Sequence, residues 1–243
     1  MQIILILTIS FLASLFRSTL GFGESLIAVP LFLLFLPLKV AVPLSVLLSI
    51  IIALIIVIQD HKNIHFQSAK WLVIYAITGI PLGLLILIYG NETLVKITLG
   101  FLIIIYSLYT LLNTKIKIHK PENNKLWLFI CGFLSGVFGG AYGLNGPPLV
   151  IYGKLQNWTA KHFRATLQAY FLPASLIGAI GYYTKGLITA EVNQYFLYSL
   201  TTTVPAIFLG RYLNSKLNGK SFYKYINWFL IIIGLVLILS SLK

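Results

Sequence analysis

Two charged side chains, Arg17 and Glu24, interrupt an otherwise uncharged apolar stretch near the start of the chain. An ionised side chain is costly inside a lipid bilayer unless it faces a partner or a water-filled path. The guanidinium of Arg17 could attract and hold an anion, and Glu24 could carry a coupling proton. Alternatively, the two side chains could form an ion pair that fixes the local backbone and never contacts a ligand. The sequence leaves both interpretations open.

Glycine-rich segments break two long apolar stretches, FRSTLGFGES at residues 16–25 and FGGAYGLNGPP at residues 138–148. After each break we expect a half-helix to begin, at about Ser25 and at about Pro147, because proline suits the first turn of a helix. Free N–H groups and unwound backbone that meet deep in a membrane make a site for an anion. The candidate binding residues of the two breaks are Arg17, Gly21, Gly23, Glu24, Ser25, Gly143, Asn145 and Gly146.

Glycines also allow helices to pack closely in membranes. Close packing is therefore the alternative role for the glycines of the two breaks, and it is the role that we predict for two other glycine pairs. These pairs are Gly79 with Gly83 and Gly136 with Gly140.

Further polar side chains lie near the second break. Asn145 offers neutral donors to the same cavity, or caps the half-helix that follows. In KHFRATLQAYFLP, Arg164 and Gln168 lie one helical turn apart; we expect Arg164 to anchor at the cytoplasmic mouth and Gln168 to line a path. The four histidines fall in predicted loops without a third ligand nearby, so we predict no metal site; they are His61, His65, His119 and His162.

The composition places these residues in a membrane. Of 243 residues, 58% are hydrophobic and 9% are charged, with a mean hydropathy of +0.93, so a water-soluble surface could not be built. Nearly uncharged runs at 40–58, 71–90, 99–112 and 225–242 approach the length of about 20 residues that crosses a bilayer as a helix. Because they lack the period-two alternation of a barrel, the expected fold class is all-α, polytopic and transmembrane.

The sequence contains a weak internal repeat, in which the second half of the chain resembles the first. FL at residues 11–12 through Gly21 matches FL at 133–134 through Gly143, Pro81 matches Pro205, and FLIII at 101 recurs at 229. We therefore predict two repeats, residues 1–113 and 126–243, joined by a cytoplasmic linker at 114–125. Each repeat would contain one in-and-out hairpin and three crossing helices, and because three is odd the repeats would be inverted.

Loop charges support the hairpin interpretation. With hairpins, thirteen basic residues face one side and four face the other, whereas single crossings would divide them eight against nine. The larger group contains Lys62, Lys70, Lys115, Lys117, Lys120, Lys125, Lys154, Lys161, Arg164, Arg211, Lys216, Lys220 and Lys224, and the smaller contains Lys39, Lys96, Lys185 and Lys243. The positive-inside rule then places both termini on the non-cytoplasmic side. The hairpin legs, about 13 to 18 residues in the first repeat, favour partial penetration.

The sequence resembles the sulfite exporter TauE/SafE family, also called the toluene sulfonate uptake permease family. The resemblance rests on GFGESLIAVPLFLLF, GFLSGVFGGAYGLNGPPLVIY, KHFRATLQAYFLPASLIGAIGYY and VPAIFLGRYLNSKL, and it covers essentially the whole chain. It implies an inner-membrane permease for sulfite, sulfonates, sulfoacetate or related anions, driven by an ion gradient.

The leading hypothesis is a secondary transporter that binds an anion between the two hairpin tips. The alternatives are an anion channel on the same scaffold and a membrane assembly subunit without flux. No nucleophile with a base and no nucleotide-binding loop is evident, so we predict neither an enzyme nor a cofactor. The expected partners are a small anion, the lipid bilayer and a coupling proton or cation, with no nucleic acid; a homodimer is left open.

Overall fold

The structure, a computed structural model, describes residues 1–112, 124–216 and 220–242, and within these ranges it contains ten α-helices, one 3-10 helix and no strand. The elements are α1 (Gln2–Leu20), α2 (Glu24–Phe32), α3 (Leu38–Asp60), η1 (His61–Asn63), α4 (Phe66–Tyr89), α5 (Glu92–Leu112), α6 (Asn124–Tyr142), α7 (Gly146–Leu155), α8 (Ala160–Thr184), α9 (Ala190–Lys216) and α10 (Lys220–Ser241). Most of the predicted linker lies outside the described residues, and so do His119, Lys115, Lys117, Lys120 and Lys243.

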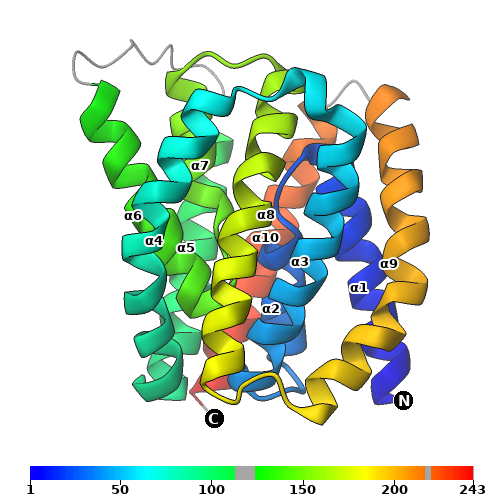
Figure 1. Cartoon of the computed structure of the whole chain (residues 1–243). Helices are drawn as coiled ribbons and strands as arrows, with labels where there is room; N and C mark the ends of the chain where they lie inside the picture. Colours follow the sequence, from blue (N-terminus) through cyan, green and yellow to red (C-terminus); the bar gives the residue numbers. More distant parts are fainter. Residues whose placement is uncertain (113–123, 217–219, 243) are drawn as a thin grey trace.

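Both ends of the chain lie at the same end of the molecule, the lower end in Figure 1. Helices α3, α5, α7 and α9 all end at the opposite end of the molecule, so each of the pairs α1 with α2 and α6 with α7 leaves and returns on one side. This is the parity that the loop charges predict for two in-and-out hairpins.

The legs of the hairpins differ in length. The first legs, α1 and α6, have 19 residues each, whereas the returning legs, α2 and α7, have 9 and 10. At about 1.5 Å per residue, a first leg approaches the thickness of the hydrocarbon core and a second leg does not. Helix α1 is thus close to the upper end of the expected length and, like most of α6, is long enough to cross a membrane, whereas the returning legs have the length of partial penetration.

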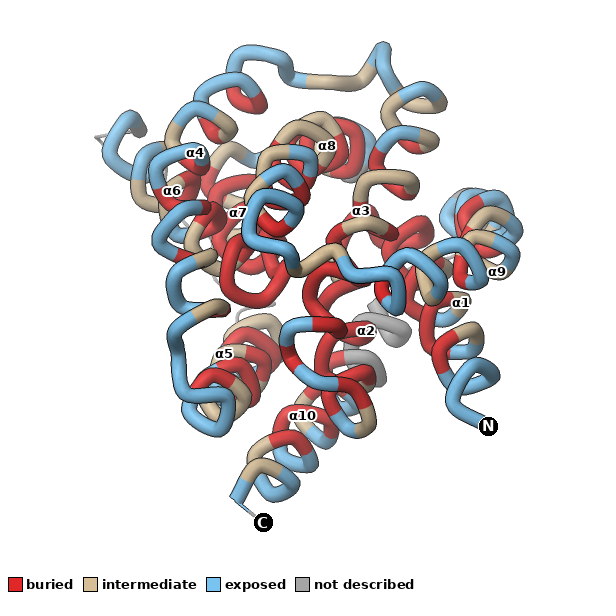
Figure 2. The backbone as a smooth tube through the Cα atoms, turned by 60° about the horizontal axis from the view of Figure 1, so that its bottom comes forward, coloured by how far each residue is buried: buried red, intermediate tan, exposed pale blue. Residues whose placement is uncertain are grey.

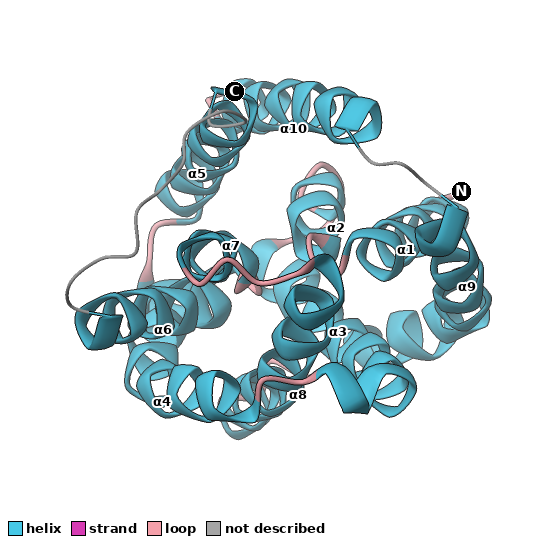
Figure 3. Cartoon of the chain, turned by 90° about the horizontal axis from the view of Figure 1, so that it is seen from above, coloured by secondary structure: helices cyan, strands magenta, loops and turns pink. Residues whose placement is uncertain are grey.

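The short helices α2 and α7 lie inside a ring of longer helices (Figure 3). Nearly every residue of both is buried (Figure 2). Around them α1 packs against α9, α4 against α6, α5 against α10 and α3 against α8. Each half of the chain thus follows one order, a long helix, a short buried helix and three long helices, which is consistent with the predicted duplication.

Large apolar side chains cover the outside of the ring. Phe101, Ile105, Ile180, Ile232 and Leu239 each expose more than half of their surface. Within the described part of the chain, five helices are long and apolar enough to cross a membrane: α1, α3 with η1, α4, α5 and most of α6. An outer surface of this kind needs lipid around it, and the chain is a polytopic helical membrane protein.

The predicted packing glycines form the seam between α4 and α6. A Cβ on Gly79 or Gly83 would lie 2.2 or 2.1 Å from a carbonyl oxygen of α6, and a Cβ on Gly136 or Gly140 would lie 2.3 Å from one of α4. Only glycine lets the two backbones approach this closely, so the packing role is confirmed for these two pairs.

Candidate functional site

The first break occurs where the sequence predicts it. Helix α1 ends at Leu20 and is capped by Gly21, whose φ is 88°, and Gly23 has a φ of 96° before α2 begins at Glu24. Glycine adopts these left-handed conformations without the steric cost that a side chain brings. The N–H of Gly21 still donates to the carbonyl of Arg17 at 2.7 Å, which ends the helix with Arg17 in its last turn. The chain then turns back with Glu24 in the first turn of α2.

The second break is similar. Gly143 has a φ of 66°, and α7 begins at Gly146 with proline in its first turn. Asn145 occupies the N-cap position, but its side chain makes no capping hydrogen bond. The capping alternative is therefore wrong. Its Oδ1 is buried against Gly139 and has no hydrogen-bond partner among the described residues, while the side chain as a whole lines the space between the breaks.

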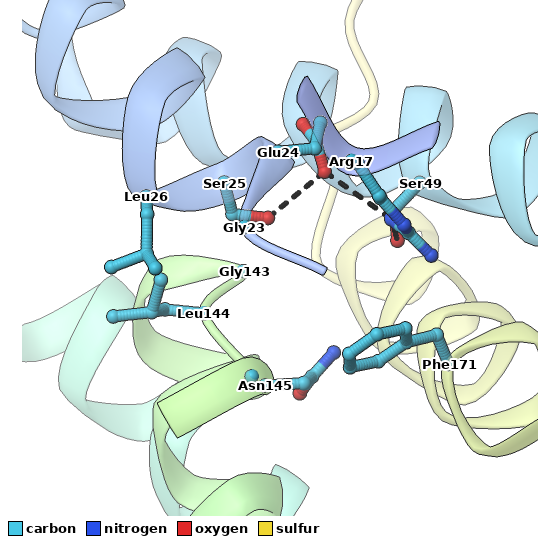
Figure 4. A pocket seen from close by; sticks show the side chains of 11 residues that line it. Arg17, Gly23, Glu24, Ser25, Leu26, Ser49, Gly143, Leu144, Asn145 and Phe171 are labelled. Atoms are coloured by element: carbon cyan, nitrogen blue, oxygen red, sulfur yellow. Dashed lines mark hydrogen bonds and ion pairs between the residues drawn. The ribbon is translucent and has the colours of Figure 1, made fainter. Parts of the chain in front are cut away.

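The two breaks meet. A Cβ on Gly146 would lie 3.4 Å from a ring carbon of Phe22, and one on Gly143 would lie 3.1 Å from the side chain of Val46 on α3. A cavity of about 10 Å³ lies between them. Its lining comes from both breaks, α3 and α8: Arg17, Gly23, Glu24, Ser25, Leu26, Ser49, Gly143, Leu144, Asn145, Gly146 and Phe171. Figure 4 shows Arg17, Glu24 and Ser49 on one side and Asn145 on the other.

Arg17 is almost fully buried, and each of its three nitrogens is bound. Nε and Nη2 donate to Oε1 of Gln168 at 3.2 and 2.8 Å, and Nη1 donates to Oγ of Ser49 at 2.6 Å. Nη1 also lies 3.4 Å from Oε2 of Glu24. The guanidinium carbon lies 4.7 Å from the centre of the Phe171 ring. A neutral amide, a hydroxyl, a carboxylate and an aromatic face thus hold the cation in the interior.

Glu24 is equally buried, with 1% of its surface exposed. Besides Arg17, its carboxylate accepts hydrogen bonds from Ser45 at 2.7 Å and from Ser25 at 3.0 Å. Its position in the first turn of α2 is electrostatically favourable, because the N-terminal end of a helix is positive. The carboxylate therefore occupies the place in which a half-helix could hold an anionic ligand.

A comparison with known families decides which proteins share this architecture. The family model described as "Sulfite exporter TauE/SafE" matches residues 6–237. The chain belongs to the TauE/SafE family. Neither a curated protein nor a solved structure matches the chain significantly. The family description is that of a membrane transport protein for a sulfur oxyanion rather than that of an enzyme.

In this TauE/SafE protein, the predicted site residues come together, but two of them take a different place. Gln168 was expected to line a path; it is fully buried, does not line the cavity, and instead binds Arg17 and donates from Nε2 to the carbonyl of Gly21 at 2.6 Å. Gly21 likewise lies outside the lining, against α8. The ion pair between Arg17 and Glu24, which we considered as an alternative, is present. It does not exclude a ligand role, because both partners line the cavity.

Sequence reasoning missed the contributions of α3 and α8 to the site. Ser45 and Ser49 bind Glu24 and Arg17, Ser49 is within hydrogen-bond distance of Ser175 at 3.1 Å, and Phe171 covers Arg17. A signal was available, because Ser45 and Ser49 are spaced i,i+4 in an otherwise apolar helix and therefore share a face. No group of metal-ligating side chains occurs among the described residues.

Proposed function

We propose that this TauE/SafE protein is a secondary transporter for a small sulfur-containing anion, such as sulfite, a sulfonate or sulfoacetate. The single observation that supports the proposal best is a buried arginine facing a cavity that both glycine breaks enclose. Arginine offers several fixed donors to an oxyanion, and Asn145 lines the cavity from the other break, where the NH2 group of its amide could donate to the same ligand.

The cavity in its present form is too small for the proposed ligand. A volume of about 10 Å³ has room for about one water molecule and not for a sulfur oxyanion. In the proposed cycle, one hairpin tip moves away from the other, the anion enters from that side, and the opposite tip opens in the next step. Ser49 lies close to the middle of the 23-residue helix α3, so the cavity is near the middle of the predicted membrane span.

Coupling to a proton follows from the position of Glu24. An ionised Glu24 neutralises Arg17 and repels an incoming anion at the same place. When Glu24 takes up a proton, Arg17 is left with an uncompensated positive charge, and the anion can replace the carboxylate. One proton and one anion then move together, although a coupling cation would serve the same purpose.

The proposal includes a membrane location and an internal repeat. The protein would lie in the inner membrane with both termini on the non-cytoplasmic side, because the basic residues of η1, of the end of α7 and of the start of α8 lie at the opposite end of the molecule. Residues 1–113 and 126–243 would be inverted repeats, each of which supplies one tip to the binding site.

The test is uptake by purified protein in liposomes, screened with sulfite, sulfate, thiosulfate, taurine and sulfoacetate. We expect saturable uptake of at least one of these anions. Arg17→Ala should lower it by at least about tenfold, because hydrogen bonds to a charged group contribute about 1.5–3 kcal/mol. Arg17→Lys should also lower uptake, since it keeps the charge but loses the planar array of donors. Asn145→Ala should have a smaller effect.

Two matched controls are available. Lys185→Ala removes a positive charge, and Asn193→Ala removes an amide, both at exposed positions outside the site, and neither should change uptake. Melting temperatures in the same detergent identify variants that fail to fold. Uptake that never saturates would indicate a channel. Uptake that is absent, or unchanged in Arg17→Ala and Asn145→Ala, would contradict the proposal and favour an assembly subunit.

A further inference from the structure

A second and larger cavity opens where α3 ends, α8 begins and α9 ends. Its volume is about 350 Å³, and the residues that decide its chemistry are Asp60, Lys161, Arg164, Arg211 and Asn214. We call this cavity the vestibule. It lies at the end of the molecule to which the larger group of basic residues belongs. Three cationic side chains against one carboxylate give its lining a net positive charge.

Arg164 lines the vestibule and has donors without a hydrogen-bond partner among the described residues. Only 7% of its surface is exposed. Its Nη1 donates to Oδ1 of Asn214 at 3.3 Å, and its Nε lies 3.5 Å from Oδ2 of Asp60 without making a hydrogen bond. Nη2 has no hydrogen-bond partner within the described part of the chain. A buried guanidinium with a free N–H edge is a favourable site for a planar or tetrahedral oxyanion, which can accept two hydrogen bonds from it.

The vestibule is adjacent to the first hairpin tip. A Cβ on Gly21 would lie 3.0 Å from Cβ of Arg164, and Nδ2 of Asn214 donates to the carbonyl of Thr19. One turn further along α8, Gln168 binds Gly21 and Arg17. Four helical residues span about 6 Å, so Arg164 at the vestibule and Gln168 beside Arg17 contact the same glycine from one face of α8.

The corresponding surface at the second tip is formed by uncharged residues. A Cβ on Gly143 would contact the side chain of Val46, the hydroxyl of Ser45 and the carbonyl of Val42 on α3. Val42 and Val46 lie 122 residues before Arg164 and Gln168, the same separation as between Gly21 and Gly143. One tip therefore rests against an arginine and a glutamine, and the other rests against two valines and a serine. The cationic cavity is a feature of one side of the molecule and not a consequence of the helix arrangement.

We infer that the vestibule is a second anion-binding site, in which Arg164, assisted by Arg211 and Lys161, binds a small oxyanion. The anion competes with Asp60 for the guanidinium. Because charge and not shape selects the ligand, sulfate and sulfite should bind with similar affinity. The assignment of this site as the waiting position for the transported anion rests on the proposed function; the binding itself does not.

Equilibrium binding of ³⁵S-labelled sulfate to purified Arg17→Ala protein tests the vestibule with the central site disabled. We expect binding to persist. Arg211→Gln in that background should weaken it by about threefold to tenfold, and Asp60→Asn should strengthen it by a similar factor, as expected for one charge a few ångströms away in a partly wet cavity. Lys185→Gln, at the other end of α8, is the matched control and should change nothing.

Changes of opposite sign at Arg211 and Asp60 are the result that supports the vestibule site. Loss of all sulfate binding in Arg17→Ala, or equal effects of Arg211→Gln and Lys185→Gln, would overturn it. The two proposals can fail separately. If sulfate binding depends on Arg211 and Asp60 but the unmodified protein takes up no anion, the vestibule site is supported and the transporter function is contradicted. If uptake depends on Arg17 but sulfate binding does not depend on Arg211 and Asp60, the transporter function is supported and the vestibule site is contradicted.

Discussion

Arg17 is held from one side by a neutral amide and from the other by a carboxylate. Gln168 binds two of its nitrogens, and Gln168 is itself fixed by the carbonyl of Gly21, so this side of the guanidinium is locked. Glu24 contacts only Nη1, at the longer distance of 3.4 Å. The carboxylate is thus the partner that an anionic ligand can replace, and Gln168 is a positioning residue.

Glu24→Gln tests the coupling at the residue scale. The amide has the size of the carboxylic acid but cannot bind or release a proton, so it mimics the protonated state permanently. We expect exchange of anion across the liposome membrane to persist within a few-fold, whereas acceleration of net uptake by a pH gradient should disappear. Both are measured on the same liposomes, with and without an imposed gradient.

The control for this substitution is Glu92→Gln. Glu92 forms an ion pair with Lys96 at 2.8 Å at the start of α5, where about half of its side chain is exposed. Such surface pairs contribute little to stability, so uptake and its response to pH should stay unchanged. A Glu24→Gln protein that still responds fully to the gradient would assign the coupling to another group.

At the scale of the elements, the second break fixes the position of Asn145 through a glycine on the preceding helix. A Cβ on Gly139 would lie 1.7 Å from Oδ1 of Asn145. Tyr182 donates to the carbonyl of Gly139 at 3.1 Å, which holds this turn of α6 against α8. The helix cannot retreat from the amide, so the absence of a side chain at position 139 is what admits Asn145 to the cavity.

Gly139→Ala should therefore displace the amide of Asn145. We expect uptake to fall about as far as in Asn145→Ala, with a loss of stability of about 1–3 kcal/mol from overpacking. Gly178→Ala on α8 makes the same change where the nearest atom lies 4.0 Å away; it should leave uptake unchanged and, because alanine favours helix, should not lower the melting temperature. Equal uptake by the two variants would mean that the position of Asn145 does not matter.

The glycine breaks could be predicted because local conformation determines them. Gly21, Gly23 and Gly143 take left-handed conformations that other residues rarely adopt, so their types alone mark the breaks. The side chains that surround Arg17 in the site could be predicted only in part. Ser49 and Phe171 reach Arg17 from helices far away in the chain, and helix packing decides which faces meet. The contact of Gln168 with Arg17 could not be predicted for the same reason: the depth of Gln168 follows from the sequence, but its partner does not.

For the whole molecule, charge asymmetry is the property that predicts its orientation in the membrane. The basic residues of η1, of the end of α7 and of the start of α8 lie at one end of the molecule and the termini at the other. Since positively charged loops stay in the cytoplasm during insertion, the vestibule would open to the cytoplasm and the central cavity would be reached from it past the first tip. The side of the membrane to which the vestibule opens decides from which side an anion first reaches Arg164.

Cysteine labelling tests this orientation. Cys131, the single cysteine, is buried, so a Cys131→Ser protein provides an unreactive background. Lys185→Cys and Lys62→Cys then place one thiol in an exposed segment at each end of the molecule. In bacterial spheroplasts, a membrane-impermeant maleimide should label Lys185→Cys directly and Lys62→Cys only after permeabilisation. The reverse pattern would place both termini in the cytoplasm and turn the vestibule toward the outside. Labelling of both thiols in intact spheroplasts would mean that the charge difference does not fix one orientation.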